Sequence, residues 1–323
     1  MTSLRNAGYP ANLFTVNPTT VNGGSFLVTN GGASTYNALQ IEVRRRMASG
    51  LLLQGSYAWS KSLTNMPASS SAGSSQPTTF RSSLNDKGPS PWDIRHGLKL
   101  NYVYELPIGP GKRYFSHGNV IARKALEGWQ ISGVSRVQSG SPDRITSNRG
   151  TFNNAADNGV VLYNMTAADL NEAIKIRKTT ASNGFGLVYF LPQDLVNNSL
   201  AAWEVGGFTL NNLDRTKPYI GPQTDPGKLG YRIWMYGPWQ ARFDVSLAKE
   251  TRIAEGKTLE LRAQALNVVN SVNFLLGAAG NEVNTGGVGA TFGQTRSAYR
   301  DITVSGSSDP GGRIVEFVVR FRF

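Results

Sequence analysis

The ten residues IVEFVVRFRF, 314–323, decide the fold class because an apolar side chain occupies every second position. The intervening positions include Glu316, Arg320 and Arg322. A period of two directs alternate side chains to opposite faces of a β-strand. The segment is therefore predicted to be a strand with one charged face and one apolar face, whose members are Val315, Phe317, Val319, Phe321 and Phe323.

Six other segments show the same alternation of apolar and polar residues. They are residues 37–46, 51–60, 95–107, 128–140, 241–249 and 258–267. Most of them contain about ten residues, which matches a tilted strand that crosses hydrocarbon better than the five or six residues common in soluble proteins. The sequence thus predicts an all-β antiparallel fold with about seven long strands.

The connections between these strands differ in length. They are short or moderate at 47–50, 107–127 and 251–257, and long at 63–91, 140–237 and 271–311. Short turns at one end and long loops at the other are typical of transmembrane β-barrels of the outer membrane, whose long loops are extracellular. Phe323 is then expected at the end with the short turns.

Aromatic residues lie near the ends of the predicted strands, where a girdle at the membrane interface would lie. The expected girdle residues are Tyr57, Trp59, Tyr102, Tyr104 and Trp129. The polar faces carry charged residues, for which ion pairing inside a barrel is the expected role. These are Glu42, Arg44, Arg136, Asp244, Glu260, Arg262, Glu316 and Arg320. The alternative is a secreted or surface β-sandwich adhesin or lectin, which would bury the apolar rows in a shared core.

The connection 140–237 is too long to lack structure of its own. Thr166 and Asp169 have the spacing of a capping box, and apolar residues continue at helical spacing as far as Ile174, followed by Arg177. A second short helix is expected after Pro192, through Trp203. We expect this connection to form a small folded cap.

The chain offers little chemistry for an enzyme. Cysteine is absent, which excludes disulfides and thiolate metal sites. The motif Gly256-Lys-Thr lacks the first glycine of a phosphate-binding loop and is interpreted as a hairpin tip. His96 and His117 have no second ligand at metal spacing, and the net charge of +12 comes without a nucleic-acid-binding motif. We expect no catalysis, cofactor, metal or nucleic acid, and only structural pairing between Asp93 and Arg95.

Taken in order, the segments resemble the C-terminal third of a TonB-dependent outer-membrane transporter. The resemblance is to the Oar-like group, whose full-length members usually begin with a carboxypeptidase-regulatory-like domain. It is carried by YNALQIEVRRR (36–46), GSYAWSKSL (55–63), DIRHGLKLNYVYELPIGPGKR (93–113), GWQISGVSRVQSG (128–140), ARFDVSLAKETRI and LELRAQALNVVNSVNF (241–274), and IVEFVVRFRF. MTAADLNEAI and VYFLPQDLVNNS resemble an extracellular insert found in one branch of that group.

The resemblance implies a 22-stranded barrel with an internal plug and a TonB-box segment. Residues 1–35 would be an extracellular lead-in, and 36–323 the C-terminal portion of the barrel, with 140–237 as an extracellular insert. Neither plug, TonB box nor signal peptide is recognised, and seven strands cannot close so wide a barrel without exposing backbone to lipid. The chain is therefore expected to be a fragment of a longer transporter or a truncated reading frame.

The implied activity is uptake of a bulky, scarce solute of the siderophore, oligosaccharide or peptide class across the bacterial outer membrane. Expected partners are membrane lipid, lipopolysaccharide phosphates near the basic loops, and TonB acting through a plug that this chain lacks. The terminal row Val315 to Phe323 resembles the signal that the barrel-assembly machinery reads. Extracellular ligand contacts are expected at Arg149, Tyr189, Trp203, Arg215 and Tyr231.

Overall fold

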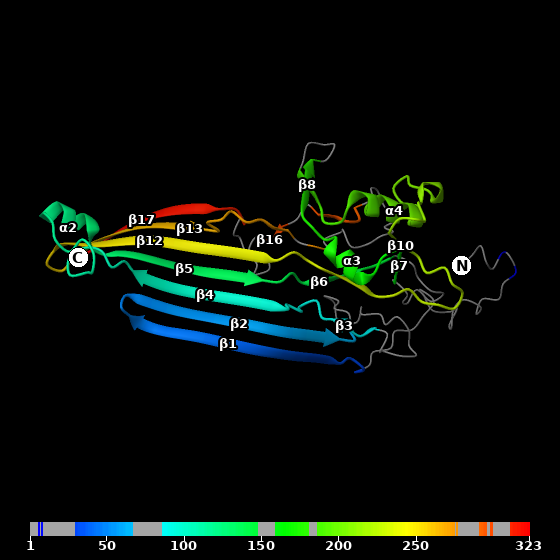
Figure 1. Cartoon of the computed structure of the whole chain (residues 1–323), viewed down its shortest axis with the longest axis horizontal. Helices are drawn as coiled ribbons and strands as arrows, with labels where there is room; N and C mark the ends of the chain where they lie inside the picture. The colour runs from blue at the N-terminus through cyan, green and yellow to red at the C-terminus, as the bar shows by residue number, and fades with distance from the viewer. Residues whose placement is uncertain are drawn as a thin grey trace.

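The fold is given by a computed structural model that describes residues 30–66, 86–147, 159–180, 186–274, 276, 291–295 and 311–323, together with residues 6 and 8 and the backbone of 298–299. Figure 1 shows a long sheet that extends along the molecule and, at one end of it, a group of short strands and helices. No helix in the described ranges is long and apolar enough to cross a membrane.

Seven long strands form one antiparallel sheet in which neighbours follow chain order. They are β1 (Ser34–Ala48), β2 (Leu51–Thr64), β4 (His96–Glu105), β5 (Trp129–Gln138), β12 (Gln240–Ala254), β13 (Lys257–Leu266) and β17 (Ile314–Arg322). The two-residue strand β3 (Gly88–Pro89) pairs with the end of β2. The seven predicted strands are confirmed, and the shortest of them has nine residues.

The short turns lie at one end of this sheet, as predicted. Between β1 and β2, Ser49 and Gly50 both have positive φ, at 52° and 81°, which is the backbone of a type I′ hairpin. Gly256, with φ of 70°, lies in the β12–β13 turn and confirms that the Gly-Lys-Thr motif is a hairpin tip. Phe323 lies at the same end, which we call the short-turn end (Figure 1).

A helix in the β4–β5 connection, at the same end, was not predicted. This helix, α2 (Val120–Leu126), begins where the side chain of Asn119 accepts a hydrogen bond from the Ala122 N–H at 2.8 Å. The chain then turns into β5 through Gly128, whose φ is +71°. A Cβ at that position would overlap the carbonyl oxygen of Glu250 in β12, so only glycine fits between the helix and the sheet.

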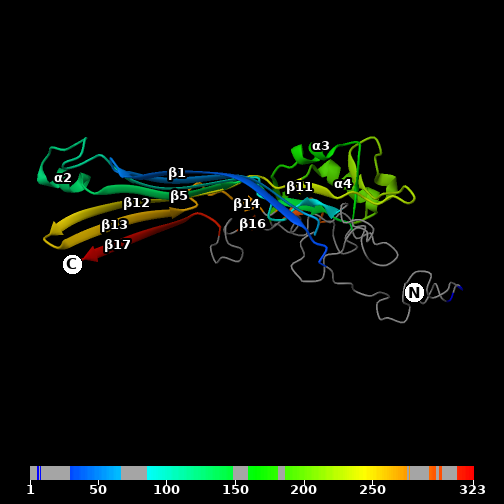
Figure 2. The same ribbon diagram turned by 90° about the horizontal axis from the view of Figure 1, so that it is seen from below.

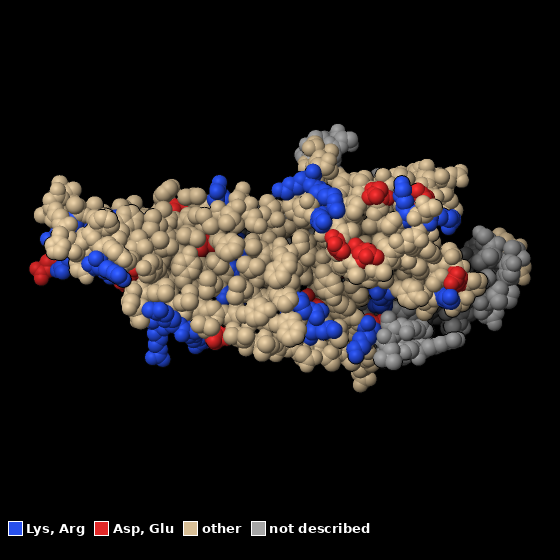
Figure 3. Space-filling view, viewed as in Figure 1, with Lys and Arg blue, Asp and Glu red and all other residues tan. Residues whose placement is uncertain are grey.

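The strand register brings the apolar positions of all the strands onto one face. A row of Cα partners crosses six strands through Leu53, Tyr102, Gly133, Val245, Ala265 and Val315. The sheet is curved, as Figure 2 shows, and in Figure 3 tan atoms cover most of the strands while charged side chains gather toward the ends and edges. The apolar face is exposed: Phe317 has 78 % of its surface accessible and Val319 71 %.

The buried hydrophobic core lies outside the seven strands. Every buried apolar residue in the described ranges belongs to residues 145–235 or is Phe292. A β-sandwich would cover the apolar face of its sheet with a second layer, and among the described residues no such layer packs on these strands. The exposed sheet therefore gives no support to the sandwich alternative.

The described residues of the connection 140–237 form a small body, the cap, at the long-loop end (Figure 1). It contains β6 (Pro142–Ile145), β7 (Val161–Tyr163), α3 (Ala167–Glu172), β8 (Arg177–Thr180), β9 (Gly186–Tyr189), α4 (Gln193–Trp203), η3 (Leu210–Asn212), β10 (Tyr219–Gly221) and β11 (Ile233–Tyr236). From the last connection, β14 (Asn273–Phe274) pairs with β16 (Ala298–Tyr299), and β15 (Gln294–Thr295) pairs with β9. A folded cap with two helices was predicted and is confirmed.

The first predicted cap helix is shorter than expected. The capping box of Thr166 and Asp169 is present, with 2.8 Å from the Thr166 N–H to the carboxylate of Asp169, but α3 ends at Glu172. The predicted continuation through Arg177 is wrong. The Arg177 guanidinium donates hydrogen bonds to the carbonyl oxygens of Ala173 and Phe190, both at 3.1 Å, and the residue begins β8. A long-range contact thus overrides the helical spacing.

Two glycines in the β4–β5 connection, Gly111 and Gly128, provide a matched test of the close contact between Gly128 and β12. Gly111 has φ of +70°, close to that of Gly128, but its missing Cβ faces open space. We expect Gly111→Ala to lower the free energy of unfolding by about 1–2 kcal/mol, the cost of left-handed backbone, and Gly128→Ala to lower it by about 1–3 kcal/mol more through overlap with Glu250. Urea unfolding followed by tryptophan fluorescence measures both; equal losses would contradict the assigned contact.

Candidate functional site

The polar face of the sheet is hollowed. A cavity of about 630 Å³ lies at the short-turn end, and among its lining residues are Glu105, Gln130, Glu260 and Arg322. A second cavity of about 350 Å³ lies farther along and is lined by Asn101, Ser132, Asp244, Arg262 and Gln264, among others. Opposite the apolar face, the sheet thus presents a concave surface of amides and charges.

One buried carboxylate organises the charges near the short-turn end. Glu260 in β13 has 6 % of its surface exposed. It accepts hydrogen bonds from Arg262 at 2.6 Å and from Arg322 at 3.1 Å, and Arg320 lies 3.5 Å away as a third cation. Because Arg320 and Arg322 belong to β17, this cluster ties the last strand to its neighbour.

Other charges on the polar face pair two residues apart along one strand. Arg44 lies 2.5 Å from Glu42 in β1, and Arg242 lies 3.1 Å from Asp244 in β12. Residues at i and i+2 share a face, so this spacing brings opposite charges together without a second strand. The predicted ion pairing is confirmed for most of the charged residues named from the sequence; Arg136 and Glu316 lie on the same face.

The pair of Asp93 and Arg95 lies just before β4. The Asp93 carboxylate is buried, accepts the Ser62 N–H at 2.6 Å and forms an ion pair with Arg95 at 3.0 Å. Burial and the charge of Asp93 also raise the pKa of Tyr236, in that order of importance. The predicted structural pairing is confirmed: one oxygen of Asp93 holds the loop to β2 through Ser62, and the other pairs with Arg95.

The aromatic residues named from the sequence lie toward both ends of the sheet. Tyr57 and Trp59 lie toward the long-loop end, with the Tyr57 hydroxyl 2.8 Å from Nδ1 of His96. Tyr102, Tyr104 and Trp129 lie toward the short-turn end. His96 and Tyr104 are eight residues apart, about 27 Å along an antiparallel strand. Their role as a girdle stays a prediction.

Sequence reasoning missed one residue of this aromatic group. Trp239 stacks on His96 with 5.7 Å between the ring centroids, and its surface is largely exposed. It lies just before β12 and after Pro238, outside the alternating segment, so periodicity could not select it. The only available signal was its place immediately next to a predicted strand.

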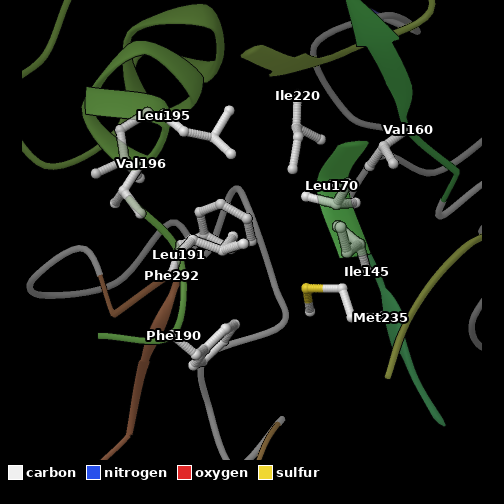
Figure 4. Close-up of a cluster of buried hydrophobic side chains, with 11 residues drawn as sticks. Ile145, Val160, Leu170, Phe190, Leu191, Leu195, Val196, Ile220, Met235 and Phe292 are labelled. Carbon is white, nitrogen blue, oxygen red and sulfur yellow. The ribbon is translucent and has the colours of Figure 1, made fainter. Parts of the chain in front are cut away.

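The cap is held together by a core to which two connections contribute. Leu191 lies near Leu195 and Val196 of α4, and Phe292 reaches the same cluster from the last long connection (Figure 4). Phe190 belongs to the same cluster. Its other members are Ile145, Val160, Leu170, Leu200, Ile220 and Met235. Described residues of the two long connections therefore pack into one body at this end of the sheet.

Polar contacts hold α3 to β11 within the cap and tie the cap to the loop before β3. Asn171 of α3 donates to the Trp234 carbonyl at 3.0 Å and accepts the Tyr236 N–H at 2.8 Å, which fixes the helix beside the chain that enters β12. The buried carboxylate of Asp86 pairs with Arg232. Burial and the neighbouring charge of Arg232 lower the pKa of Arg144 to about 10. A charged junction thus separates the cap core from the strands.

The predicted ligand contacts belong to separate parts of the cap. Trp203 donates its indole N–H to the Ile220 carbonyl at 3.0 Å and packs against the cap core. Tyr189 is in β9, while Arg215 and Tyr231 are exposed. In the described ranges no hydrogen bond, ion pair or ring contact joins these four to one another. Arg149 lies outside the described residues, and ligand binding by all five stays a prediction.

A family model described as an outer membrane beta barrel domain matches residues 5–304. The chain belongs to this family. No curated protein and no solved structure matches the chain. Membership of the outer-membrane β-barrel family gives the location, the bacterial outer membrane. In a β-barrel of this family the exposed apolar face of the sheet is the face that meets lipid, and the hollowed polar face is the interior.

The Glu260 cluster of this outer-membrane β-barrel can be tested by removing one charge. Glu260→Gln would leave three arginines together without their counter-charge, and we expect a loss of about 1–2 kcal/mol, limited by solvent at the exposed arginine side chains. Samples are heated to a series of temperatures before electrophoresis, and the measurement is the temperature at which the band of folded protein disappears. Glu316→Gln, on the same face of β17 without an ion pair among the described residues, is the control. Equal shifts would contradict the cluster's role.

Proposed function

We propose that the chain forms part of the wall of an outer-membrane receptor that takes up a bulky, scarce solute by TonB-dependent transport. The solute would be of the siderophore, oligosaccharide or peptide class. The observation that carries the proposal is the combination of a hollowed polar face with a folded cap at the long-loop end. In this mechanism the cap captures the solute, a plug pulled by TonB rearranges, and the solute passes along the polar face.

The packing of the cap supports capture rather than simple loop exposure. A core of fully buried side chains fixes the relative positions of its surface residues, and fixed positions reduce the entropy lost when a solute binds. Arg215 and Tyr231 offer a guanidinium and an aromatic ring on that surface. These groups suit anionic or ring-bearing solutes, and the cap's basic residues are also proposed to contact lipopolysaccharide phosphates.

Growth on limiting nutrients tests the proposed uptake. Cells with and without the intact gene are compared when iron is supplied as a ferric siderophore, carbon as maltooligosaccharides, or nitrogen as short peptides. We expect growth on one of these to require the gene and to be lost in cells that lack TonB. Growth that requires the gene but not TonB would contradict energised uptake, and unchanged growth on all three would contradict the proposed solute classes.

We also propose that the terminal row of β17 is the signal for the barrel-assembly machinery. Val315, Phe317, Val319, Phe321 and Phe323 lie on the exposed apolar face at the edge of the sheet, a position from which a strand can pair with another protein. The ring of Phe323 is almost fully exposed and lies 6.0 Å from that of Phe321. Both features leave the terminal aromatic available for recognition.

Deleting Phe323 is expected to reduce the amount of folded protein in the outer membrane at least several-fold, because the terminal ring would be lost while the strand remains. The readout is fractionation together with heat-dependent gel migration. Phe323→Tyr keeps an aromatic end and should insert normally, and Arg322→Ala controls for a change next to the terminus. Normal insertion of the deletion variant would refute the assembly role.

A further inference from the structure

We propose that α2 and the turn before it lie in the periplasmic leaflet of the outer membrane, where they bind the headgroups of phospholipids. The inference rests on the membrane-wall orientation given under the proposed function, but it concerns a different surface. That surface consists of residues 112–124, and we call it the α2 patch.

The C-terminal end of α2 is attached to the lipid-facing side of the sheet. The indole N–H of Trp129 donates to the Ala125 carbonyl at 2.8 Å. The ammonium group of Lys249 donates to the carbonyls of Lys124 and Glu127, at 2.7 and 2.9 Å, and lies 5.5 Å from the centre of the Trp129 ring. Both side chains therefore hold the last carbonyls of the helix.

Trp129 and Lys249 belong to the apolar face. They are Cα partners across β5 and β12, and two residues farther along lie Ile131 and Leu247, which are also partners. A tryptophan ring at a strand end and a lysine whose stem crosses apolar surface are the residues expected where hydrocarbon meets headgroups. The helix that they hold is therefore continuous with the lipid-facing surface.

The α2 patch exposes large apolar side chains that no part of the described chain covers. Val120 has 72 % of its surface accessible, Ile121 80 % and Phe115 68 %. In water such groups are unfavourable, whereas a helix at the interface buries them about 5–10 Å into the boundary between headgroups and acyl chains. In helix α2 only Ala122 and Leu126 are partly covered, while Val120 and Ile121 remain exposed.

Basic residues flank these apolar groups. Arg113 and Arg123 lie in the α2 patch, whereas its two lysines are already paired, Lys112 with Glu105 and Lys124 with Glu127. Arg113 lies 5.3 Å from the Tyr114 ring, and Arg123 is exposed without a described carboxylate partner. Cations beside apolar groups match the phosphate and acyl portions of a phospholipid.

A lipid surface fits the α2 patch better than a protein does. Helix α2 has seven residues and exposes two large apolar side chains. A stable protein interface takes roughly 800 Å² and about 20–30 residues from each partner, which is more than residues 112–124 can supply. The patch also continues a surface that already faces lipid. A periplasmic protein that covers it is the alternative outcome of the test below.

The absence of cysteine from the chain permits single spin labels at chosen depths. The full chain carrying Ile121→Cys is reconstituted into vesicles of phosphatidylethanolamine and phosphatidylglycerol, and the label's accessibility to oxygen and to a water-soluble nickel chelate is measured. Val319→Cys on the lipid-facing face and Glu255→Cys in the β12–β13 turn give the hydrocarbon and water references. We expect the Ile121 label to be several-fold less accessible to nickel than the Glu255 label.

Three results decide the proposal. Nickel accessibility at Ile121 equal to that at Glu255, with Val319 protected, would overturn the lipid contact and leave the barrel wall intact. Protection at Ile121 that appears only when periplasmic extract is added would also overturn it and indicate a protein partner. Exposure of both Ile121 and Val319 to nickel would overturn the proposed function as well. In the supporting case, Arg123→Gln moves the Ile121 label measurably toward water.

Discussion

Backbone hydrogen bonding in hydrocarbon is the constraint on which the rest of the structure depends. Inside a membrane each unsatisfied N–H or C=O group costs several kcal/mol, so strands must pair continuously along their length. The antiparallel ladder satisfies this between β1 and β17 and simultaneously fixes the register. A shift of one residue would move every apolar side chain of a strand to the other face. The pairing of the strands therefore also determines which face of the sheet is apolar.

The same requirement separates the molecule into two kinds of packing. In the seven strands, apolar side chains face outward, so packing between them supplies no buried core. In the cap, apolar side chains such as Leu170 and Phe190 are fully buried, as in any soluble domain. The ion pair of Arg232 with Asp86 ties the cap to the loop before β3.

The strands could be predicted from the sequence because a period of two is a local signal that ten residues suffice to display. The cap helix at Thr166 was likewise visible from its capping box, but its end was not, because Arg177 forms hydrogen bonds with Phe190. Phe292 reaches the cap core from another connection, and no local pattern reports such a contact.

Helix α2 escaped prediction for a related reason. With only seven residues it shows less than two full turns of periodicity, and its end is held by Lys249, more than a hundred residues away in the chain. The proposed ligand contacts could be chosen only by residue type, because no other signal in the sequence bears on ligand binding. Trp203 illustrates the limit, since its ring packs against the cap core and its indole N–H is bonded within the cap.

The number of long strands has a consequence for closure. Seven strands that alternate in direction leave β1 and β17 pointing the same way, both from the long-loop end to the short-turn end. Direct pairing of these two edges would be parallel, whereas the strands of outer-membrane barrels are antiparallel and even in number. An antiparallel barrel that includes this sheet therefore places an odd number of additional strands between β17 and β1.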